Sequence, residues 1–441
     1  MANKKGSIDV SALAAACRKE TSRLIEDYGP RLPGTEACTA VAQQIARQAR
    51  AFADSVRVEP FRVHPGSFYS YTKILPISYL VGMAAMLGAG APGSAASGAG
   101  LAFAGLAVAG LAAGIALMIL QFGFYRHVGD ELFTPRAGMN VEAVIEPRGK
   151  AERELVVSGH HDSAPVARIF SSPFSRLYVV AVLAPYLFFA AELALLVAFL
   201  AGSPAPSRGW ALPFLAAGLP FVVGYFLLVA LRRGSPGAGD NLVASMMVVG
   251  LGKEIAARKA SLLASTRIRV VSFDAEEAGL RGAAAYFEAH AAELSLLPCV
   301  HLNFDGLYRL RDLQVLTSDV NGSVKLSRHL ADALVACAKQ DGLALRTYGM
   351  VFGAGGTDAA ESARRGIPST SIIATPTEVF GDRLVYHTLR DTVEHVEPAV
   401  VEACLRIILR FLAKLEAGEA GAGQPGPRPG RSRRSPARRR S

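Results

Sequence analysis

Two long tracts without a polar face dominate the hydropathy pattern of the chain. The 52 residues between Lys73 and Arg126 contain no Asp, Glu, Lys or Arg, and a Gly/Ser/Pro-rich stretch divides them. The second tract, residues 177–231, holds a single acid, Glu192, and is divided at the sequence AGSPAPSRG. A bilayer span needs about 20 apolar residues. The pattern therefore predicts two transmembrane hairpins, with four spans near residues 74–91, 99–124, 177–200 and 210–231.

Basic residues gather at the ends of the predicted spans that lie away from the hairpin turns. By the positive-inside rule, this predicts that both termini and the region between the hairpins are cytoplasmic. We therefore expect an integral, multi-pass protein of a bacterial-type inner or plasma membrane, with the lipid bilayer as a partner. Glu192 has two interpretations, a functional intramembrane carboxylate or a group paired within the bundle. The basic residues are Lys73, Arg126, Arg168, Arg176, Arg232 and Arg233.

Outside these tracts, short β-branched or apolar runs alternate with Ala-rich helical stretches. This alternation predicts an α/β fold with a mixed, mostly parallel sheet and helices on both faces, in addition to the four transmembrane helices. The expected strands are 154–158, 267–273, 299–304, 313–317 and 369–374, and the expected helices are 35–51, 241–258, 280–294, 324–340 and 398–415.

The predicted organisation interleaves one domain with the two hairpins. Residues 1–72, 126–176 and 232–416 would form the domain, 73–125 and 177–231 the hairpins, and 417–441 a disordered Arg/Pro-rich tail. About 330 residues lie outside the hairpins, which is enough for a sizeable core.

Composition supports a membrane-embedded chain and argues against several other classes. Of the 441 residues, 51% are hydrophobic and 19% charged, against about 25% charged in ordinary soluble domains. Seven of the ten net positive charges are arginines of the tail, which leaves +3 for residues 1–420, so nucleic-acid binding is not expected. Five cysteines without a CxxC pair exclude a disulfide scaffold and a cysteine zinc cluster. The first 20 residues lack an apolar segment typical of a signal peptide.

Histidines and carboxylates follow the predicted strands, where open α/β sheets place their ligand sites. In ELVVSGHHDS, His160 and Asp162 share one face of an extended segment, so the carboxylate can orient a metal-binding imidazole. In SFDAEEAGLRG, the adjacent acids Glu276 and Glu277 would repel without a cation beside them, which suggests a metal ligand next to a general base. Taken alone, the first pair is also explained by chance or core pairing, and the second by an exposed acidic turn.

Three more segments complete the candidate set. PGAGDN places Asp240 at the start of a helix, where Asp is also a routine N-cap. HLNFDG ends a strand with Asp305, and LVYHTLRDT supplies His387 beside Tyr386 and near Asp391. Together the segments offer two histidines, three carboxylates and a spare Glu, which suits two divalent ions in a hydrolase.

Read in order, these segments resemble the M28 family of metallopeptidases, the co-catalytic zinc aminopeptidases. The likeness starts at GPRLPGTEACTAVAQQIARQ and ends near YHTLRDT and HVEP, and it excludes the hydrophobic tracts. The ordered combination of HxD, GAGDN, a double Glu followed by AGLRG, NFDG and YHTLRD is specific, although no single motif is decisive.

The resemblance implies a zinc-aminopeptidase-like fold and two zinc ions per chain. It implies that His160 and Asp305 are terminal ligands of one ion, Glu277 and His387 of the other, and that Asp240 bridges them.

The resemblance also implies catalytic roles around a hydroxide held by the two zinc ions, which would be the nucleophile. Glu276 matches the general base, Asp162 the carboxylate that orients His160, and Tyr386 a residue that stabilises the oxyanion. Asp358, in GGTDAAESARRGIPS, matches a segment on the substrate side of the site, although the usual form of that segment is not kept.

The chain departs from the family in the spacing of its ligands. Asp240 lies 80 residues after His160, because the second hairpin occupies the interval, so we expect the hairpins to be inserted in loops that hold the catalytic face near the bilayer. His161 is not expected to be a ligand, because strand alternation points it away from His160 and Asp162.

Three functions follow as hypotheses. The first is a membrane-bound dizinc aminopeptidase acting on peptides. The second is a glutaminyl-cyclase-like transferase with a single zinc, and the third a non-catalytic membrane protein with a peptidase-like domain. Side-chain specificity, physiological substrate and oligomeric state do not follow from the sequence.

Overall fold

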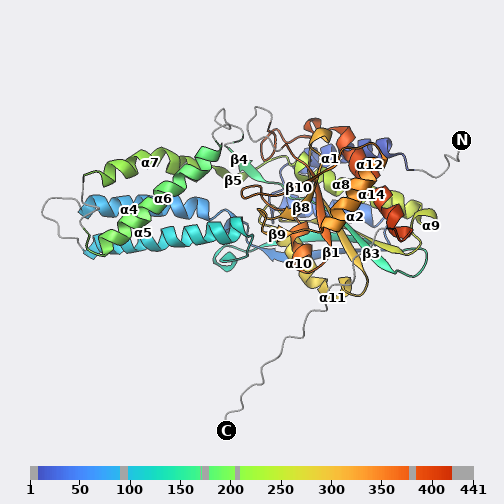
Figure 1. The fold of residues 1–441 in the computed structure, drawn as a ribbon, viewed down its shortest axis with the longest axis horizontal. Coiled ribbons are helices and arrows are strands. Elements are labelled where there is room, and N and C mark those ends of the chain that lie inside the picture. The colour runs from blue at the N-terminus through green and yellow to red at the C-terminus, as the bar shows by residue number, and fades with distance from the viewer. Residues whose placement is uncertain are drawn as a thin grey trace, which may run out of the picture.

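An α/β domain and a bundle of apolar helices that projects from one side of it make up the molecule (Figure 1). The computed structural model describes residues 8–89, 98–168, 170, 178–203, 209–376 and 384–419. Most of the tail that the sequence predicts to be disordered, from residue 420 onward, lies outside the described residues.

The centre of the domain is one mixed sheet in the order β1-β2-β6-β3-β7-β11-β8-β10, with β9 paired to β8. Strands β6, β3, β7 and β11 are parallel, whereas β2 runs antiparallel to both β1 and β6, and β8 antiparallel to β11. The strands are β1 (Ser55–Val63), β2 (Arg136–Ile145), β3 (Arg153–His160), β6 (Thr266–Phe273), β7 (Cys299–Leu307), β8 (Gln314–Asp319), β9 (Val324–Lys325), β10 (Arg346–Gly349) and β11 (Ser369–Ala374). The predicted mixed, mostly parallel sheet is confirmed.

Helices cover both faces of this sheet. The larger core packs five helices against residues such as Leu155 and Val157 of β3, while Val156 of the same strand joins a smaller core on the other face. The first group is α1 (Val10–Tyr28), α2 (Glu36–Ala49), α8 (Val243–Ala257), α12 (Arg328–Gln340) and α14 (Pro398–Glu416), and the second includes α10 (Arg281–Ala289) and α11 (Ala291–Leu294). The remaining short elements are α3 (Pro65–Phe68), α9 (Lys259–Leu262), α13 (Ala359–Arg364), η2 (Asp130–Leu132), η5 (Ala238–Leu242), η6 (Leu310–Asp312) and η7 (Val393–His395).

Helix boundaries follow local capping chemistry. The side chain of Thr35 accepts a hydrogen bond from the Cys38 backbone and begins α2, and Ser327 begins α12 in the same way. The helix predicted from residue 324 therefore starts later, after the short strand β9. The helix predicted over 280–294 is divided at His290 into α10 and α11.

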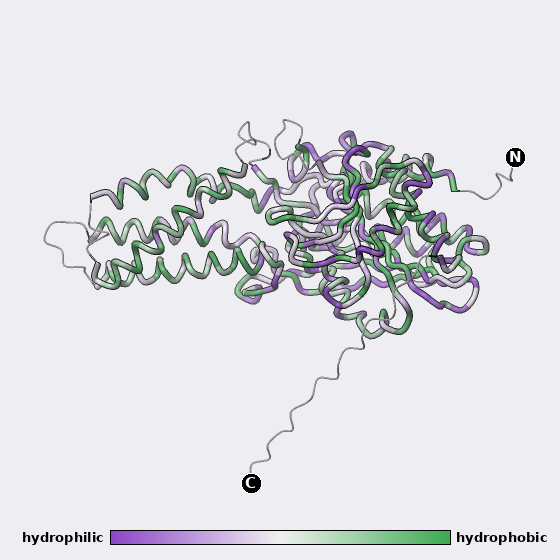
Figure 2. The backbone as a smooth tube through the Cα atoms, viewed as in Figure 1, coloured by the Kyte–Doolittle hydropathy of each residue, from purple (hydrophilic) through white to green (hydrophobic). Residues whose placement is uncertain are grey.

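Four apolar helices form the bundle around a core of their own (Figure 2). They are α4 (Tyr71–Ala89), α5 (Gly98–Leu117), which continues as the π-helical turn η1 (Met118–Gly123), α6 (Tyr178–Leu200) and α7 (Ala211–Phe226). Large apolar side chains such as Leu106 and Leu187 are exposed on its outer surface. Glu192 is buried in it, against Gly82 of α4, and neither of its carboxylate oxygens has a hydrogen-bond partner.

Three helices of the described residues, and not four, are long and apolar enough to cross a membrane. The expectation of four spans is therefore wrong for the last helix, α7, which has 16 residues. At 1.5 Å per residue it would reach about 24 Å, less than the roughly 30 Å of a hydrocarbon core. The apolar run predicted up to residue 231 leaves the helix after Phe226 because Val229 and Ala230 enter a strand, β5 (Val229–Gly234), which pairs with β4 (Pro165–Ala167).

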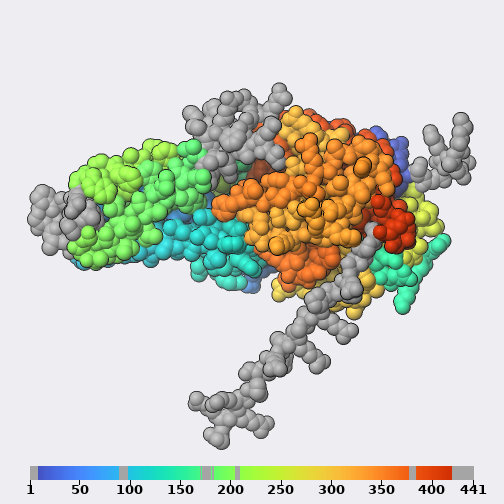
Figure 3. All heavy atoms as spheres, viewed as in Figure 1, coloured from blue at the N-terminus to red at the C-terminus, as the bar shows by residue number. Residues whose placement is uncertain are grey.

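The bundle is inserted where the parallel strands end. The chain enters it after β1 and after β3, and it returns before β2 and, through β5, before the turn that carries Asp240. Because β1, β3 and β6 point the same way, all four connections meet at the carboxyl edge of the sheet. Figure 3 shows the bundle standing out from the rounded domain as a separate lobe.

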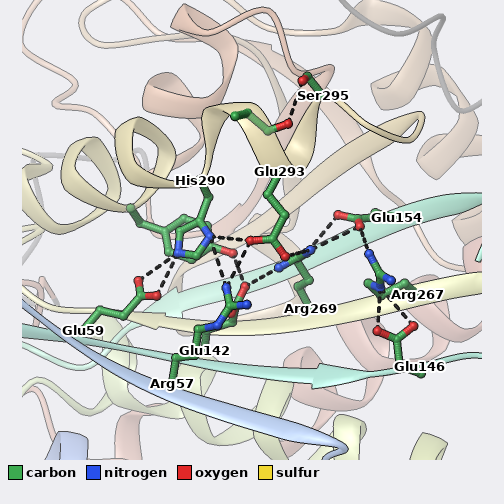
Figure 4. Close-up of polar contacts among 12 residues, drawn as sticks. Arg57, Glu59, Glu142, Glu146, Glu154, Arg267, Arg269, His290, Glu293 and Ser295 are labelled. Carbon is green, nitrogen blue, oxygen red and sulfur yellow. Dashed lines mark hydrogen bonds and ion pairs between the residues drawn. The ribbon is translucent and has the colours of Figure 1, made fainter.

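A network of buried ion pairs crosses the sheet away from the carboxyl edge, towards the amino ends of β3 and β6 (Figure 4). Arg269 of β6, 1% exposed, donates to Glu154 at 2.8 Å, to Glu142 at 2.7 Å and to Glu293 at 2.7 Å. His290 reaches Glu59 at 2.8 Å beside them. Each buried charge has an opposite partner, so protein groups alone balance the charges of this cluster.

Candidate metal centre

The carboxyl edge of the sheet gathers the candidate ligands. His160 is the last residue of β3, Asp305 lies near the end of β7, and Glu277 follows β6 by four residues. Asp240 comes from the turn before α8 and His387 from the loop before α14. Residues from five separate segments thus converge because parallel strands end at one edge.

Asp240 lies between the two histidines. Its Oδ1 is 3.2 Å from His160 Nε2, and its Oδ2 is 3.0 Å from His387 Nε2. Asp305 lies 3.6 Å from His160 Nε2, and Glu277 lies 3.3 Å from His387 Nε2. The five residues therefore form two sets of three ligands, each set within 4.8 Å, and both sets contain Asp240.

Four ligand atoms in this centre are buried without a hydrogen-bond partner: His160 Nε2, His387 Nε2, Asp240 Oδ2 and Glu277 Oε1. Buried polar atoms are almost always bonded, so unpartnered atoms that face one another point to a missing cation. Imidazole nitrogen and carboxylate oxygen are ligands that zinc takes in proteins. The residues present therefore fit a zinc centre, and a carboxylate with one oxygen toward each imidazole fits a bridge between two ions.

The charge balance of the centre also favours cations. Burial raises the pKa of Glu277 to about 7. The pKa of His387 is raised to about 10 by the carboxylates of Glu277 and Asp240, against the opposing effect of burial. The two histidines in turn hold the pKa of Asp240 below its usual range despite burial. Without metal the centre retains protons, which bound cations would displace.

Glu276 faces the centre without belonging to either shared set. Its Oε2 lies 3.8 Å from His160 Nε2, and the side chain lines both cavities that adjoin the centre. Burial raises the pKa of its carboxyl well above the usual value. Ala275, with a positive φ of 60°, turns the chain sharply between β6 and this acid. Glu276 is thus held next to the ligands, and it also forms a third possible ligand group with His160 and Glu277.

Asp162 joins the two halves of the ligand set. Its Oδ1 lies 3.2 Å from His160 Nδ1 and accepts the backbone N–H of Glu276 at 3.2 Å. Its Oδ2 accepts the backbone N–H of Glu277 at 3.1 Å. One buried carboxylate therefore orients the imidazole and also fixes the double-Glu turn. His161 points to the other side, where its Nδ1 contacts Ser272 Oγ at 2.9 Å.

Two positioning residues have no assigned role in the sequence analysis. Arg31 is fully buried and donates to the carbonyls of His161, at 2.7 Å, and Gly237, at 2.9 Å, so it ties the HxD segment to the Asp240 turn. Asp391 accepts the backbone N–H of Gly239 at 2.8 Å and that of Asp240 at 3.3 Å. Both lie inside segments that carry the family likeness, but the sequence alone gives them no specific partner.

The two expected substrate-side residues differ in placement. The ring of Tyr386 stacks on His387 with centroids 3.8 Å apart and lines both cavities beside the centre. Asp358 is fully buried, its carboxylate oxygens have no hydrogen-bond partner, and its neighbours Gly356 and Thr357 line a cavity in its place. Substrate contact by Asp358 stays a prediction.

Two cavities meet at the centre. One, of about 380 Å³, is bounded by domain residues that include Asp240, Asp305 and Met350. The other, of about 440 Å³, extends from Glu277 and His387 towards the bundle. Both are in the range of ligand sites, and the described residues that line them include no Lys or Arg.

The fold and the centre define a metallopeptidase-like α/β protein. Residues 222–412 match the model of peptidase family M28. The chain is similar in structure to BSAP, a zinc aminopeptidase from Bacillus subtilis, with 15% identity, coverage of 93% of this chain and 97% of that chain, and a TM-score of 0.53. It is also similar to a glutaminyl cyclase from Bacteroides thetaiotaomicron, with 11% identity, coverage of 91% and 97%, and a TM-score of 0.52. No curated protein sequence matches the chain significantly.

Residues 222–412 of the chain are therefore similar to peptidase family M28. Identities this low show a shared fold, so the reaction must be argued from the site itself.

Proposed function

We propose that the chain is a membrane-bound, dizinc aminopeptidase. The observation that carries this proposal is the pair of ligand sets that share Asp240, one completed by His160 and Asp305 and the other by Glu277 and His387. A single ion would use one set and leave the other set of buried groups without a counter-charge.

Each residue around the proposed zinc ions has a separate role in peptide hydrolysis. Two zinc ions in this centre would supply Lewis acidity, which polarises a scissile carbonyl and makes water more acidic. Glu276, whose Oε2 lies 3.8 Å from His160 Nε2, takes a proton from the attacking water and returns it to the leaving amine. Tyr386, beside His387, donates a hydrogen bond to the carbonyl oxygen of the substrate. Asp162 keeps the His160 ring oriented throughout.

The lining of the cavities supports action at the amino end of a peptide. A carboxypeptidase recognises a terminal carboxylate, usually with Arg or Lys. The described residues that line the two cavities include neither, and their charged groups are the acids Asp240, Glu276, Glu277 and Asp305 with His387. The described lining thus offers no basic side chain for a terminal carboxylate, and Glu276 is its one acid outside the two proposed ligand sets.

We further propose that the bundle spans the membrane with the domain on the cytoplasmic side. Supporting this, three helices are long and apolar enough to cross a bilayer, and exposed basic residues, among them Arg126, Arg168 and Arg232, lie at the domain end of the bundle. All five native cysteines are buried, so an Asp332→Cys variant would carry a single accessible thiol on α12. We expect a membrane-impermeant maleimide to label this thiol only after cells are opened. Labelling of intact cells would show that the domain lies on the opposite side of the membrane.

Metal content and one variant test the catalytic proposal. The full chain purified in detergent should hold about two zinc ions, and His160→Ala should hold fewer. Glu276→Gln should retain zinc but lose hydrolysis of peptides with a free amino terminus by at least about a hundredfold, in the range of general-base contributions. Unchanged turnover in Glu276→Gln would refute the role of this residue.

A glutaminyl-cyclase-like transferase is the second candidate, because cyclases are among the similar folds. The centre supports it less well, since the second ligand set would have no function in a single-zinc site. Release of ammonia from a peptide with an N-terminal Gln, together with one zinc ion per chain, would favour it. No zinc after metal-replete purification would favour a non-catalytic protein.

A further inference from the structure

The cavity of about 440 Å³ links the candidate metal centre to the bundle. On one side it is lined by Glu276, Glu277 and His387, and on the other by residues of all four bundle helices or the turns that end them. Those on the bundle side include Tyr71 and Thr72 of α4, Met118 and Phe122 of η1, Leu183 and Tyr186 of α6, Tyr225 of α7 and Leu228 after it. The substrate side of the centre therefore faces the bundle directly.

The wall of this cavity is apolar and aromatic outside the metal centre. Phe68 and Tyr125 pack with ring centroids 5.0 Å apart, and Phe122 contacts both Tyr71 and Phe352 at 6.2 and 6.5 Å between centroids. Among the described lining residues, the ionisable acids and bases other than tyrosines are the three groups of the centre. A polar peptide segment would lose its hydration here and find few partners, chiefly tyrosine hydroxyls and Thr72, whereas apolar side chains would be stabilised by burial.

The cavity extends to a residue that is also exposed on the bundle. Leu183 lines it and is nevertheless 53% exposed, on the face of α6 that also carries Leu187, 72% exposed. Leu183 lies five residues into α6, about 8 Å along the helix from its domain end. This depth corresponds to the boundary between headgroups and hydrocarbon if the bundle crosses a bilayer with the domain at its surface.

We propose that this bundle-facing cavity binds the apolar side chains beside the scissile bond of a peptide that partitions into the bilayer and enters past Leu183. The proposal rests on the proposed function for the identity of the bond that is cut. It assigns a substrate class, peptides with an apolar amino-terminal segment, and an entry route along the surface of α6.

The test compares two variants that differ only in their relation to the cavity. Leu183→Trp places a larger ring at the mouth, and Leu187→Trp places the same ring one turn further along the same exposed face. Trp is well tolerated at membrane interfaces, so both variants should fold. The probes are a peptide with five apolar amino-terminal residues, Leu-Phe-Leu-Val-Leu followed by Gly-Lys-Lys, and a matched peptide with Ser in place of the last four apolar residues.

Binding is measured in the zinc-loaded, hydrolysis-deficient Glu276→Gln background, with the full chain in phosphatidylcholine vesicles. We expect the apolar peptide to bind at least tenfold more weakly to Leu183→Trp, and within twofold of the unchanged background to Leu187→Trp. The Ser-containing peptide should not distinguish the two. In parallel, kcat/KM for the apolar peptide should fall at least tenfold in Leu183→Trp with Glu276 intact.

The outcomes separate the two proposals. Equal binding of the apolar peptide to both Trp variants, or a preference of the unchanged background for the Ser-containing peptide, would overturn the substrate class and route. Selective loss of binding in Leu183→Trp without hydrolysis by any zinc-loaded chain would support the cavity assignment and refute the peptidase. If Leu183→Trp binds less zinc or has a lowered Tm, the same measurements are made on Leu183→Phe and judged by the same criteria.

Discussion

Asp162 is the residue through which the geometry of the centre can be tested most directly. Its carboxylate faces three N–H groups: His160 Nδ1 and the backbone N–H of Glu276, both 3.2 Å from Oδ1, and the backbone N–H of Glu277, 3.1 Å from Oδ2. All three N–H groups face a carboxylate oxygen of Asp162, and this side chain is fully buried.

Asp162→Asn preserves the shape but provides only one oxygen. In either orientation of the amide, its NH₂ group faces at least one of the three donors, so at least one charge-assisted hydrogen bond is lost. Such a bond contributes about 1.5–3 kcal/mol, which corresponds to roughly 10- to 150-fold in an equilibrium constant. This range overlaps the 10- to 100-fold that partners of metal ligands typically contribute to metal affinity. Because the lost bond positions either His160 or the turn that carries Glu277, we expect zinc to bind roughly 10- to 100-fold more weakly at one of the two sets.

The measurement is a competition titration of the metal-free full chain with a chromophoric zinc chelator, in detergent. Asp332→Asn, on the exposed surface of α12, is the matched control and should bind zinc like the unchanged chain. The Tm of the metal-free variant shows whether folding is intact. If Asp162→Asn binds two zinc ions within twofold of the unchanged affinity, the positioning role of Asp162 is refuted.

Three further outcomes are expected from the same physical reasoning. Arg269→Met removes the buried counter-charge that Glu154 and Glu142 share, leaving them only the more exposed Arg267 and Arg57, and should destabilise the domain by about 3–5 kcal/mol, measured by thermal unfolding. Gly239→Ala drives a methyl group into the Tyr308 ring and should displace the Asp240 turn, reducing zinc affinity at least about tenfold. The pKa of His290 is raised by its hydrogen bond to a carboxylate, so its stabilising charge is fully present below about pH 6.5 and lost as the pH rises through the raised value. His290→Gln should therefore cost more stability at pH 5.5 than at pH 9.

Two of these predictions have a control variant within the chain, and the third compares one variant at two pH values. Arg328→Met, at an exposed surface pair, should leave Tm unchanged. Gly224→Ala adds a methyl group where no atom lies within 4 Å and should leave zinc binding unchanged. If Arg328→Met lowers Tm as much as Arg269→Met does, burial of the Arg269 charge is not the cause of the destabilisation. If His290→Gln costs the same stability at both pH values, the ion pair between His290 and a carboxylate does not contribute.

Local pattern predicted the interior strands β3, β6, β7, β8 and β11 because each contains a short run of buried apolar residues, but it missed β2 (Arg136–Ile145), an interior strand that begins with exposed residues. The strand over 369–374 is observed as Ser369–Ala374, and 267–273 as Thr266–Phe273. The edge strand β1 escaped prediction because charged residues interrupt it and Pro60 lies within it, which an edge position tolerates. The prediction of a fourth span near residues 210–231 was wrong because hydropathy alone cannot show that Val229 pairs with Ala167 in a small sheet.

The sequence by itself determined the apolar tracts, the alternation of strands and helices, and the types of residue available for a metal centre. These properties depend on local composition and periodicity, which the chain carries before it folds. Only the tertiary structure decided that Asp240 lies within 3.2 Å of His160, although helices α6 and α7 are inserted between them in the chain. It also decided that Asp391 and Arg31 hold the turn that carries Asp240.

The cavity between centre and bundle likewise exists only in the folded chain. Its walls come from segments as distant as Phe68, Leu183 and Phe352, and no spacing in the sequence relates them. Their proximity follows from the insertion of both hairpins at the carboxyl edge of a parallel sheet, since that topology directs every connection to one side of the domain.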